Sequence, residues 1–327
     1  MSANSSYFAS LLRSELAARN RIYAQNRAHA ESYGTAPVIV YEPEGERHGN
    51  FFDPAYAAIL ARPDWLRRFD KVHAQARSLP RPAENRKRRE LDSCMSSDAL
   101  LMNIFCMPGV AESAAVRSTL GIDVDSLPEF GWKARVPLRN GRFDRTEADM
   151  RWGSLLVEAK LTESDFQVRA APIVDAYRDF EEVFDRELLP RAAIATARPR
   201  RASEFPENYS QEFESELGDP EAATAIDPVV AAPAEEGYAG YQLIRNVLAA
   251  HASDASFCVL HDERRPDLRE QWFRVMAAVK TAELRVRLKV LTWQELAAVL
   301  PEDLQDFLET KYGIAAPGRV APPGPSE

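Results

Sequence analysis

Residues 145–163 read RTEADMRWGSLLVEAKLTE, and this stretch decides how the chain folds. Gly153-Ser154 separates two short segments in which apolar and polar residues partly alternate. A glycine followed by a small polar residue suits a tight type II′ turn between antiparallel strands. A β-hairpin turning there would pair Trp152 with Leu155, Arg151 with Leu156, Met150 with Val157 and Asp149 with Glu158, and would set Glu147 opposite Lys160.

This register gives the predicted hairpin one apolar and one polar face, because directly opposed residues share a face. The apolar face would carry Ala148, Met150, Trp152, Leu155, Val157, Ala159 and Leu161. The polar face would carry Glu147, Asp149, Glu158 and Lys160, with Leu156 as its apolar exception. Opposed Cβ atoms lie roughly 4.5–5.5 Å apart, so the two carboxylates of the Asp149–Glu158 pair would repel each other. A divalent metal ion between them would remove that repulsion.

A helix is the alternative for residues 155–161, since Leu, Glu, Ala and Lys all favour helices. That helix would start directly after Gly153-Ser154 and would show no clear apolar stripe at a period of 3.6 residues. The hairpin accounts for both segments together, so we expect strands.

At these residues the chain resembles the PD-(D/E)XK nuclease superfamily, whose motif is an acid on one strand, a turn, and Glu/Asp-x-Lys on the next. Here the motif reads Asp149 and then Glu158-Ala159-Lys160. Pro often precedes the first acid of the superfamily, whereas this chain has Ala148, so Glu147 and Asp149 both compete for that role. The hairpin register favours Asp149, which lies opposite Glu158.

Three further blocks resemble the restriction-endonuclease-like branch of that superfamily named after a bacterial protein of Porphyromonas. They are SSDALLMNIFCMPG at 96–109, GYQLIRNVLAA at 240–250 and VRLKVLTWQELAAVLP at 286–301. The resemblance covers residues 85–314. It implies an α/β (α+β) fold in which a central mixed β-sheet is flanked by helices in the order αβββαβ.

The resemblance also implies a metal-dependent endonuclease that hydrolyses phosphodiester bonds, with DNA as the expected substrate. Asp149 and Glu158, with the carbonyl of Ala159, would bind Mg²⁺, and Mn²⁺ could replace it. Lys160 would position or activate the attacking water, or stabilise the charge that builds up on the phosphate. Glu147 would support the site as the ion-pair partner of Lys160. Gln242 could orient a water or a phosphate, or could be an ordinary amide on a helix surface.

Periodicity along the chain predicts three regions. Residues 1–84 form a helical N-terminal extension, residues 85–314 the nuclease-like domain with an acidic, loosely packed insertion at about 198–236, and residues 315–327 a disordered tail. Helices are predicted at 6–32, 54–76, 85–105, 172–188, 238–252 and 268–279, with a loop at 34–54. Further strands are predicted at 132–138, 142–152, 257–261 and 285–291, with a turn at Asn140-Gly141 and a capping box at Thr292–Glu295.

Composition narrows the class of protein. With 327 residues, of which 45% are hydrophobic, the chain can bury a large core. It has no apolar run of membrane-spanning length and no signal-peptide pattern at its N-terminus, so we expect a cytoplasmic protein without a membrane partner. Its three cysteines lack metal-ligand spacing and read as reduced core thiols.

The charge is unevenly distributed along the chain. The net charge of −9 argues against indiscriminate attraction to nucleic acid, but residues 65–91 are strongly basic and residues 202–236 carry ten acidic residues and no Lys or Arg. Arg86, Lys87, Arg88 and Arg89 are therefore candidates for phosphate contacts. A solvated helix face explains the same run equally well.

Two other functions compete with the nuclease. One is a nucleic-acid-binding module that has lost catalysis, and the other is a non-enzymatic helical interaction protein in which Glu158-x-Lys160 is a surface accident. Whether the chain acts as a homodimer is left open. Weaker candidate residues are His261 and Asp262 at a strand end, and Ser96, Ser97 and Asn103, which could equally serve capping and packing.

Overall fold

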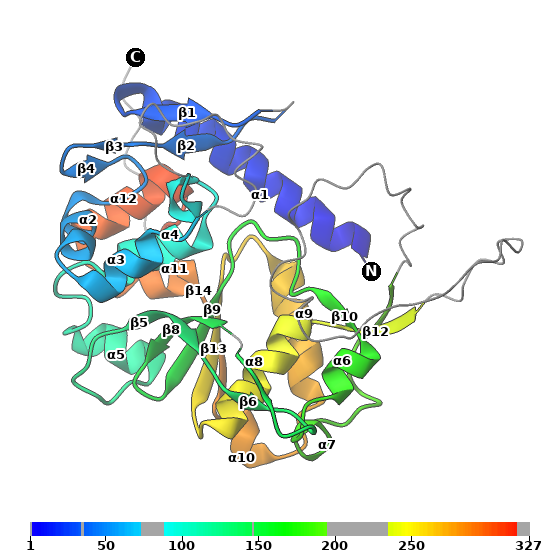
Figure 1. The fold of residues 1–327 in the computed structure, drawn as a ribbon. Coiled ribbons are helices and arrows are strands. Elements are labelled where there is room, and N and C mark those ends of the chain that lie inside the picture. Colours follow the sequence, from blue (N-terminus) through cyan, green and yellow to red (C-terminus); the bar gives the residue numbers. More distant parts are fainter. Residues whose placement is uncertain (1, 34–35, 73–87, 146, 195–234, 319–327) are drawn as a thin grey trace, which may run out of the picture.

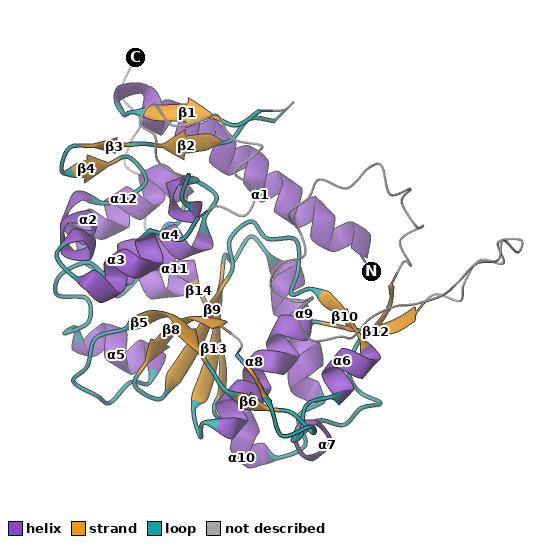
Figure 2. Cartoon of the chain, viewed as in Figure 1, coloured by secondary structure: helices purple, strands orange, loops and turns teal. Residues whose placement is uncertain are grey.

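The structure is a computed structural model that describes residues 2–33, 36–72, 88–145, 147–194 and 235–318. Its central feature is a mixed sheet, which in the described part of the chain has five strands in the order β14-β13-β9-β8-β5 (Figures 1 and 2). These strands are β5 (Glu129–Lys133), β8 (Glu147–Trp152), β9 (Leu155–Ala159), β13 (Ser256–His261) and β14 (Leu288–Thr292). The first three pair antiparallel, and β13 and β14 run parallel to β9.

Helices cover both faces of this sheet (Figure 2). On one face α8 (Tyr241–Ala252) and α9 (Pro266–Ala277) pack over Leu156, Phe257 and Val259. On the other face α4 (Ser97–Phe105), α5 (Ala114–Leu120), α11 (Trp293–Ala297) and α12 (Glu302–Tyr312) pack over residues that include Met150, Trp152 and Val157. The order α4, β5, β8, β9, α8, β13 confirms the predicted αβββαβ core.

The remaining elements lie at the margins of this core. They are α1 (Ser2–Tyr23), β1 (His29–Glu31), β2 (Ile39–Tyr41), β3 (Pro43–Glu44), β4 (Arg47–His48), α2 (Asp53–Leu60), α3 (Pro63–Phe69), β6 (Val136–Pro137), β7 (Phe143–Asp144), β10 (Val168–Ala170), α6 (Ala171–Asp175), α7 (Phe180–Val183), β11 (Arg191–Ile194), β12 (Glu235–Ala239) and α10 (Ala282–Arg285), with short 3₁₀ turns at Ala24–Asn26 and Glu90–Asp92.

The β8–β9 hairpin has the predicted register. Trp152 pairs with Leu155, Arg151 with Leu156 and Met150 with Val157. Gly153 has a φ of +59°, a conformation that glycine adopts without a steric cost. The alternative of a helix at 155–161 is therefore wrong.

The predicted faces of the hairpin are correct except at Ala148. Met150, Trp152, Leu155, Val157, Ala159 and Leu161 share one core cluster, but Ala148 belongs to the cluster on the opposite side of the sheet, with Leu156. The ladder between β5 and β8 lacks the pairing of Gly131 with Asp149, and Gly131 has a φ of +64°. The β5–β8 pair thus twists at Gly131 and Asp149, so the side chain of Ala148 lies on the opposite side of the sheet from that of Met150.

Several predicted helices are shorter than their patterns because proline and capping residues interrupt them. The helix predicted at 54–76 is divided into α2 and α3, since Pro63 lacks an N–H and begins a new helix. The helix predicted at 85–105 begins only at Ser97, because the Ser96 hydroxyl accepts a hydrogen bond from Ala99 N. The helix predicted at 6–32 ends at Tyr23. The end of its predicted range forms β1, which pairs with β2 in the segment predicted to be a loop, 34–54.

Tertiary hydrogen bonds divide the helix predicted at 172–188 into α6 and α7. Arg178 N donates to Pro137 O at 3.0 Å, and Arg139 N donates to Ala176 O at 2.9 Å, so the intervening backbone is bonded to the β6–β7 hairpin. The strand predicted at 285–291 begins at Leu288, because α10 occupies its start. The strand at 257–261, the turn at Asn140-Gly141 and the Thr292–Glu295 capping box are confirmed.

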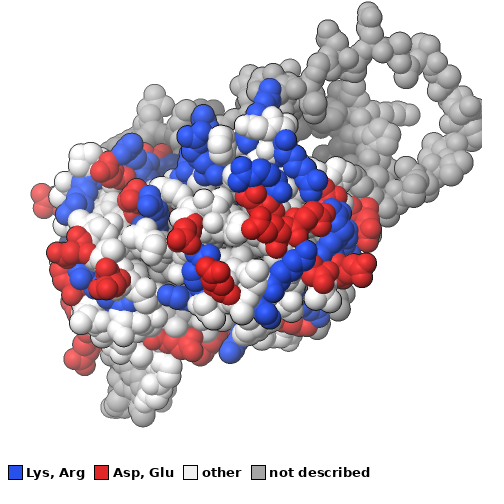
Figure 3. Space-filling model, turned by 90° about the horizontal axis from the view of Figure 1, so that it is seen from below, with Lys and Arg blue, Asp and Glu red and all other residues white. Residues whose placement is uncertain are grey.

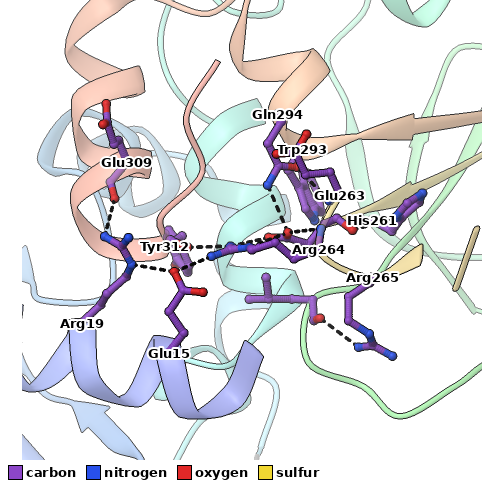
Figure 4. Close-up of polar contacts among 12 residues, drawn as sticks. Glu15, Arg19, His261, Glu263, Arg264, Arg265, Trp293, Gln294, Glu309 and Tyr312 are labelled. Atoms are coloured by element: carbon purple, nitrogen blue, oxygen red, sulfur yellow. Dashed lines mark hydrogen bonds and ion pairs between the residues drawn. The ribbon is translucent and has the colours of Figure 1, made fainter. Parts of the chain in front are cut away.

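The N-terminal helix α1 is anchored to the sheet through a chain of polar contacts (Figure 4). The Glu15 carboxylate accepts from Arg19 at 3.0 Å and from Arg264 at 2.7 Å. Arg264 also donates to the buried Asp262 carboxylate, which follows β13, and to Tyr312 O at the end of α12. The predicted N-terminal extension is therefore packed on the core in its described part.

Two predicted segments lie mostly outside the described residues: the acidic insertion at 198–236, of which only β12 is described from residue 235, and the tail at 315–327, described to residue 318. In the described part of the chain, the helices are all too short or too polar to cross a lipid bilayer.

Candidate active site

The predicted acidic pair meets where β8 and β9 separate. The regular ladder ends at Met150 and Val157, one step before Asp149 and Glu158. Beyond it, Ala159 N donates to Asp149 Oδ2 at 2.8 Å, so a carboxylate takes the place of a backbone acceptor. The Glu158 side chain is 3% exposed, and that of Asp149 is 20% exposed. The site therefore consists of one inner and one outer carboxylate at the opening of the hairpin.

Glu158 and Lys160 form a buried ion pair. Lys160 Nζ donates to Glu158 Oε1 at 2.7 Å, and Asn246 Nδ2 on α8 donates to Glu158 Oε2 at 2.8 Å. Lys160 N donates to Leu260 O at 2.8 Å, which holds this part of the chain beside β13. Both oxygens of Glu158 thus have fixed donors, and Lys160 lies on the same side of the sheet as the acidic pair.

Glu147 does not pair with Lys160, contrary to the prediction. It pairs with Arg68 on α3 and lies 3.7 Å from Lys71 Nζ. The physical reason is the turn of the strand pair at Gly131 and Asp149, which directs Glu147 towards α3. Lys160 takes Glu158 as its partner instead.

Arg68 is the centre of a second layer of the site. Its guanidinium donates two hydrogen bonds to Asp98 on α4, at 2.7 and 2.8 Å, and its Nη2 lies 3.6 Å from Asp149 Oδ1. Burial tends to lower the pKa of Arg68, but Asp98, Asp149 and Glu147 more than compensate and raise it. One buried cation therefore holds three carboxylates together.

The surroundings of the Asp149 carboxyl shift its pKa. Burial, followed by the nearby Glu158 and Asp98 carboxylates, raises its pKa well above the ordinary value, although Lys160 and Arg68 oppose the rise. Burial would lower the pKa of Lys160, but Glu158, Glu163 and Asp149 raise it instead. In this arrangement Lys160 stays a cation, because the neighbouring carboxylates outweigh the effect of its burial.

The donor set fits a hard divalent cation. Carboxylate oxygens are the ligands that Mg²⁺ prefers, and Mg²⁺ usually keeps several waters, so two protein carboxylates suffice. Burial, and after it the Glu158 and Asp98 carboxylates, raise the pKa of Asp149, and a cation bound there would oppose all three effects. Within the described residues no three His, Cys, Asp or Glu side chains are grouped as a complete metal cage, so waters or substrate oxygens would have to complete the coordination.

Arg265 and Trp293 hold the backbone at and after Lys160. The buried Arg265 donates to the carbonyls of Leu161, Glu163 and Ser164 at 2.7–3.2 Å. Asp267 accepts from the same guanidinium at 2.8 and 2.9 Å. Trp293 Nε1 donates to Lys160 O at 2.9 Å. These contacts fix the backbone of the segment that contains Lys160 and Glu163.

The other predicted site residues lie in different surroundings. Gln242 is half-buried on α8, one turn before Asn246, which is the residue that reaches Glu158. Arg88 is buried and pairs with Glu42 at 2.7 Å, and Arg89 pairs with Asp70 at 2.8 Å. Arg86 and Lys87 lie outside the described residues.

The weaker candidates have structural contacts. His261 Nδ1 is 2.8 Å from Asp262 O, and Asp262 binds Arg264 and Gln294 in the network of Figure 4. Ser96 caps α4, and Asn103 bonds the backbone of Asn50, Phe52 and Ala99. Ser97 donates to Glu163 Oε1 at 2.6 Å, which ties α4 to the loop after Lys160.

Sequence reasoning missed Arg68, Asp98, Asn246 and Arg265. Asp98 and Asn246 lie within the two blocks 96–109 and 240–250 that the resemblance had already identified, so the signal for them was present without a role. Arg68 was one charge in a basic run, and nothing in the sequence distinguished it from its neighbours.

Residues 17–313 match the model of a protein family described as Restriction Endonuclease associating with ARP. Searches of curated proteins and of solved structures found no match.

Proposed function

Because the chain belongs to the family of restriction endonucleases associating with ARP, we propose that it is a metal-dependent nuclease that hydrolyses phosphodiester bonds of DNA. Asp149 and Glu158 bind the metal, and Lys160 acts on the reacting phosphate and water. This proposal joins the restriction-endonuclease-like fold of the sheet to the chemistry of one cluster of side chains.

The observation that carries the proposal is the crowding of carboxylates at the opening of the hairpin. Asp149 lies opposite Glu158 and close to Asp98, and burial with these neighbours raises its pKa. Keeping like charges together in a buried place costs stability, so such a cluster is typical of a functional site. A surface accident of the kind assumed by the interaction-protein alternative would leave these groups solvated, whereas Glu158 and Lys160 are 2% and 5% exposed.

The residues divide the work between them. Asp149 and Glu158 would hold the divalent ion, Mg²⁺ or Mn²⁺, with the Ala159 carbonyl as a further oxygen donor. Held by these residues, a divalent ion would supply polarisation of the phosphate and a lower pKa of a coordinated water. Asn246 keeps one oxygen of Glu158 occupied, so the carboxylate cannot rotate freely.

Lys160 acts as a fixed cation. Its ion pair with Glu158 at 2.7 Å and the surrounding carboxylates keep the ammonium charged. A charged ammonium donates hydrogen bonds, so it positions the attacking water and stabilises the negative charge of the transition state. The backbone contacts from Arg265 and Trp293 keep it in place before substrate arrives.

The decisive experiment is cleavage of plasmid DNA with Mg²⁺ or Mn²⁺ by wild type and by Asp149→Asn, Glu158→Gln and Lys160→Met. Each substitution keeps the shape of the side chain and removes its charge, and we expect each to reduce the rate by about a hundredfold or more. Asp125→Asn is the matched control, because Asp125 is an exposed carboxylate that pairs only with Arg117 among the contacts described. Cleavage that survives all three site substitutions overturns the site assignment.

The alternatives predict different results from the same proteins. A catalytically silent binding module gives no cleavage but binds DNA with an affinity that falls as salt rises. A helical interaction protein gives neither cleavage nor salt-dependent binding. Either result, obtained with folded wild-type protein and both metals, would refute the nuclease.

Three finer features remain proposals. The relation to the Porphyromonas branch rests on the four sequence blocks alone. The cytoplasmic location rests on the sequence in the same way. The family description names an association with ARP, and we extend that partner to this chain without assigning it a surface.

A further inference from the structure

A hollow of about 960 Å³ opens between α3 and β5, beside the carboxylate cluster. In Figure 1, α3 and β5 lie next to each other on the side of the molecule where β5 is the edge strand of the described sheet. Arg68 and Glu147 line this hollow and also belong to the second layer of the candidate site. Asp149 and Glu158 do not line the hollow themselves, but Arg68 connects it to Asp149, whose Oδ1 lies 3.6 Å from Arg68 Nη2.

The lining of the hollow combines cations with aromatic rings. Its cations are Arg62, Arg67, Arg68, Lys71 and Lys133, against the carboxylates of Asp64, Glu129 and Glu147. Its rings are Trp65, Phe130 and Trp132. The lining thus has five cations against three carboxylates in a chain of net charge −9, although Arg67, Arg68 and Lys71 are paired with carboxylates. By contrast, the face seen in Figure 3, from the α10 end, alternates blue and red without a large patch of one sign.

Two of these rings have an arginine guanidinium close to them. The Arg62 guanidinium lies 4.8 Å from the Trp65 ring centroid, and Arg151 of β8 lies 4.8 Å from that of Trp132. Trp132 is only half-buried, whereas Trp65 is fixed by a hydrogen bond from its Nε1 to Pro128 O. Indole rings next to arginine guanidinium groups are surfaces on which unpaired bases stack.

The close approach of α3 to β5 depends on Gly131. Its φ is +64°, and a Cβ at this position would lie 3.0 Å from Arg68 Nη1. The hollow is therefore formed around the same arginine that holds Asp98, Glu147 and Asp149.

We propose that this hollow binds an unpaired stretch of the nucleic acid whose phosphodiester bond lies at Asp149 and Glu158. Bases stack on Trp132 and its arginine, while Arg62 and Lys133 contact phosphates. The volume is that of a small-ligand site, with room for about two nucleotides, and the bases of a duplex are already stacked on each other. This inference rests on the proposed function and specifies its substrate as single-stranded DNA or an unpaired end beside a duplex.

The test is equilibrium binding in EDTA, followed by fluorescence anisotropy, of a short fluorescein-labelled oligothymidylate and of a duplex of the same length. We expect wild type to prefer the single strand. Trp132→Ala weakens single-strand binding about tenfold, whereas Trp132→Phe, which keeps a stacking ring, restores most of it. Lys133→Ala weakens binding and lowers the salt dependence by about one ion.

Arg285→Ala is the matched control, since Arg285 is an exposed arginine on α10, far from α3 in Figure 1. It removes one charge, as Lys133→Ala does, and leaves binding within about twofold of wild type. Equal binding of duplex and single strand by wild type, or equal effects of Lys133→Ala and Arg285→Ala, overturns the proposal. So does unchanged binding in both Trp132 variants.

Cleavage by the same proteins separates this inference from the proposed function. If plasmid is cut and Asp149→Asn is inactive, but the hollow variants bind normally, the nuclease stands and the hollow proposal is refuted. If wild type cuts nothing but binds the single strand through Trp132 and Lys133, the hollow proposal stands and the catalytic one is refuted.

Discussion

Replacing Arg68 by methionine should make the protein less stable without metal and more responsive to metal. Arg68 is the cation shared by Asp98, Glu147 and Asp149, with two hydrogen bonds to Asp98 at 2.7 and 2.8 Å. Methionine keeps the length and apolar stem of the side chain but removes the cation that all three carboxylates share, and leaves Lys71 beside Asp98 and Glu147. Removing one member of a buried ion pair costs about 3–5 kcal/mol, and we expect a loss in unfolding free energy in that range.

The response to metal follows from the distance to Asp149. At 3.6 Å from its Oδ1, the guanidinium competes with any second cation for the same carboxylate. Two opposite unit charges at such a distance attract by about 4–5 kcal/mol at an effective dielectric constant near 20. Arg68→Met removes this attraction, so the Asp149 carboxylate is left with more charge for a metal ion to neutralise. Saturating Mg²⁺ should therefore stabilise Arg68→Met by at least about 1 kcal/mol more than it stabilises wild type.

Urea unfolding followed by tryptophan fluorescence, with and without Mg²⁺, measures both effects. Arg117→Met is the control, because Arg117 pairs with the exposed Asp125 at 3.0 Å and donates to Ala111 O at 2.7 Å, and such a surface pair and hydrogen bond each contribute about 1 kcal/mol. Equal stabilisation of wild type and Arg68→Met by Mg²⁺ would refute the placement of the metal at Asp149. A loss of stability no larger than that of the control would refute the role of Arg68 as a shared counter-ion.

Three further predictions concern residues around the site and the core. Burial lowers the pKa of Lys311 from 10.5 to about 7, so the folded state releases this proton at a lower pH than the unfolded state does. Between these two pH values the free energy of unfolding should therefore rise by about 1.4 kcal/mol per pH unit. Urea unfolding at several pH values in this interval should show a smaller rise for Lys311→Met than for wild type. Arg265→Lys keeps the charge but cannot hold three carbonyls, so kcat should fall about tenfold or more with little change in KM, and rates unchanged from wild type would contradict its positioning role. Gly131→Ala places a Cβ 3.0 Å from Arg68 Nη1 at a residue with left-handed backbone, so the free energy of unfolding, measured by thermal unfolding, should fall by about 1–3 kcal/mol. Gly141 also has a positive φ, +82°, but no atom lies within 4 Å of an added Cβ, so Gly141→Ala should lower this free energy by less.

Sequence reasoning reached the candidate site because its central motif is local. The turn at Gly153, the alternation on either side of it and the positions of Asp149, Glu158 and Lys160 all lie within one hairpin, and a two-residue turn fixes the register. The same reasoning placed Glu147 wrongly, because the turn of the strands at Gly131 depends on β5, a strand outside the hairpin.

The sequence alone determined the hairpin and the αβββαβ order, since both follow from residue periodicity and turn chemistry along short segments. Only the tertiary structure decided which groups surround the acids. Arg68 lies 79 residues before Glu147, and Asn246 lies 88 residues after Glu158, so no local pattern could connect them. Packing α3, α4 and α8 around the sheet brings these side chains to the opening of the hairpin, because the described buried polar groups there require partners that their own strands do not supply.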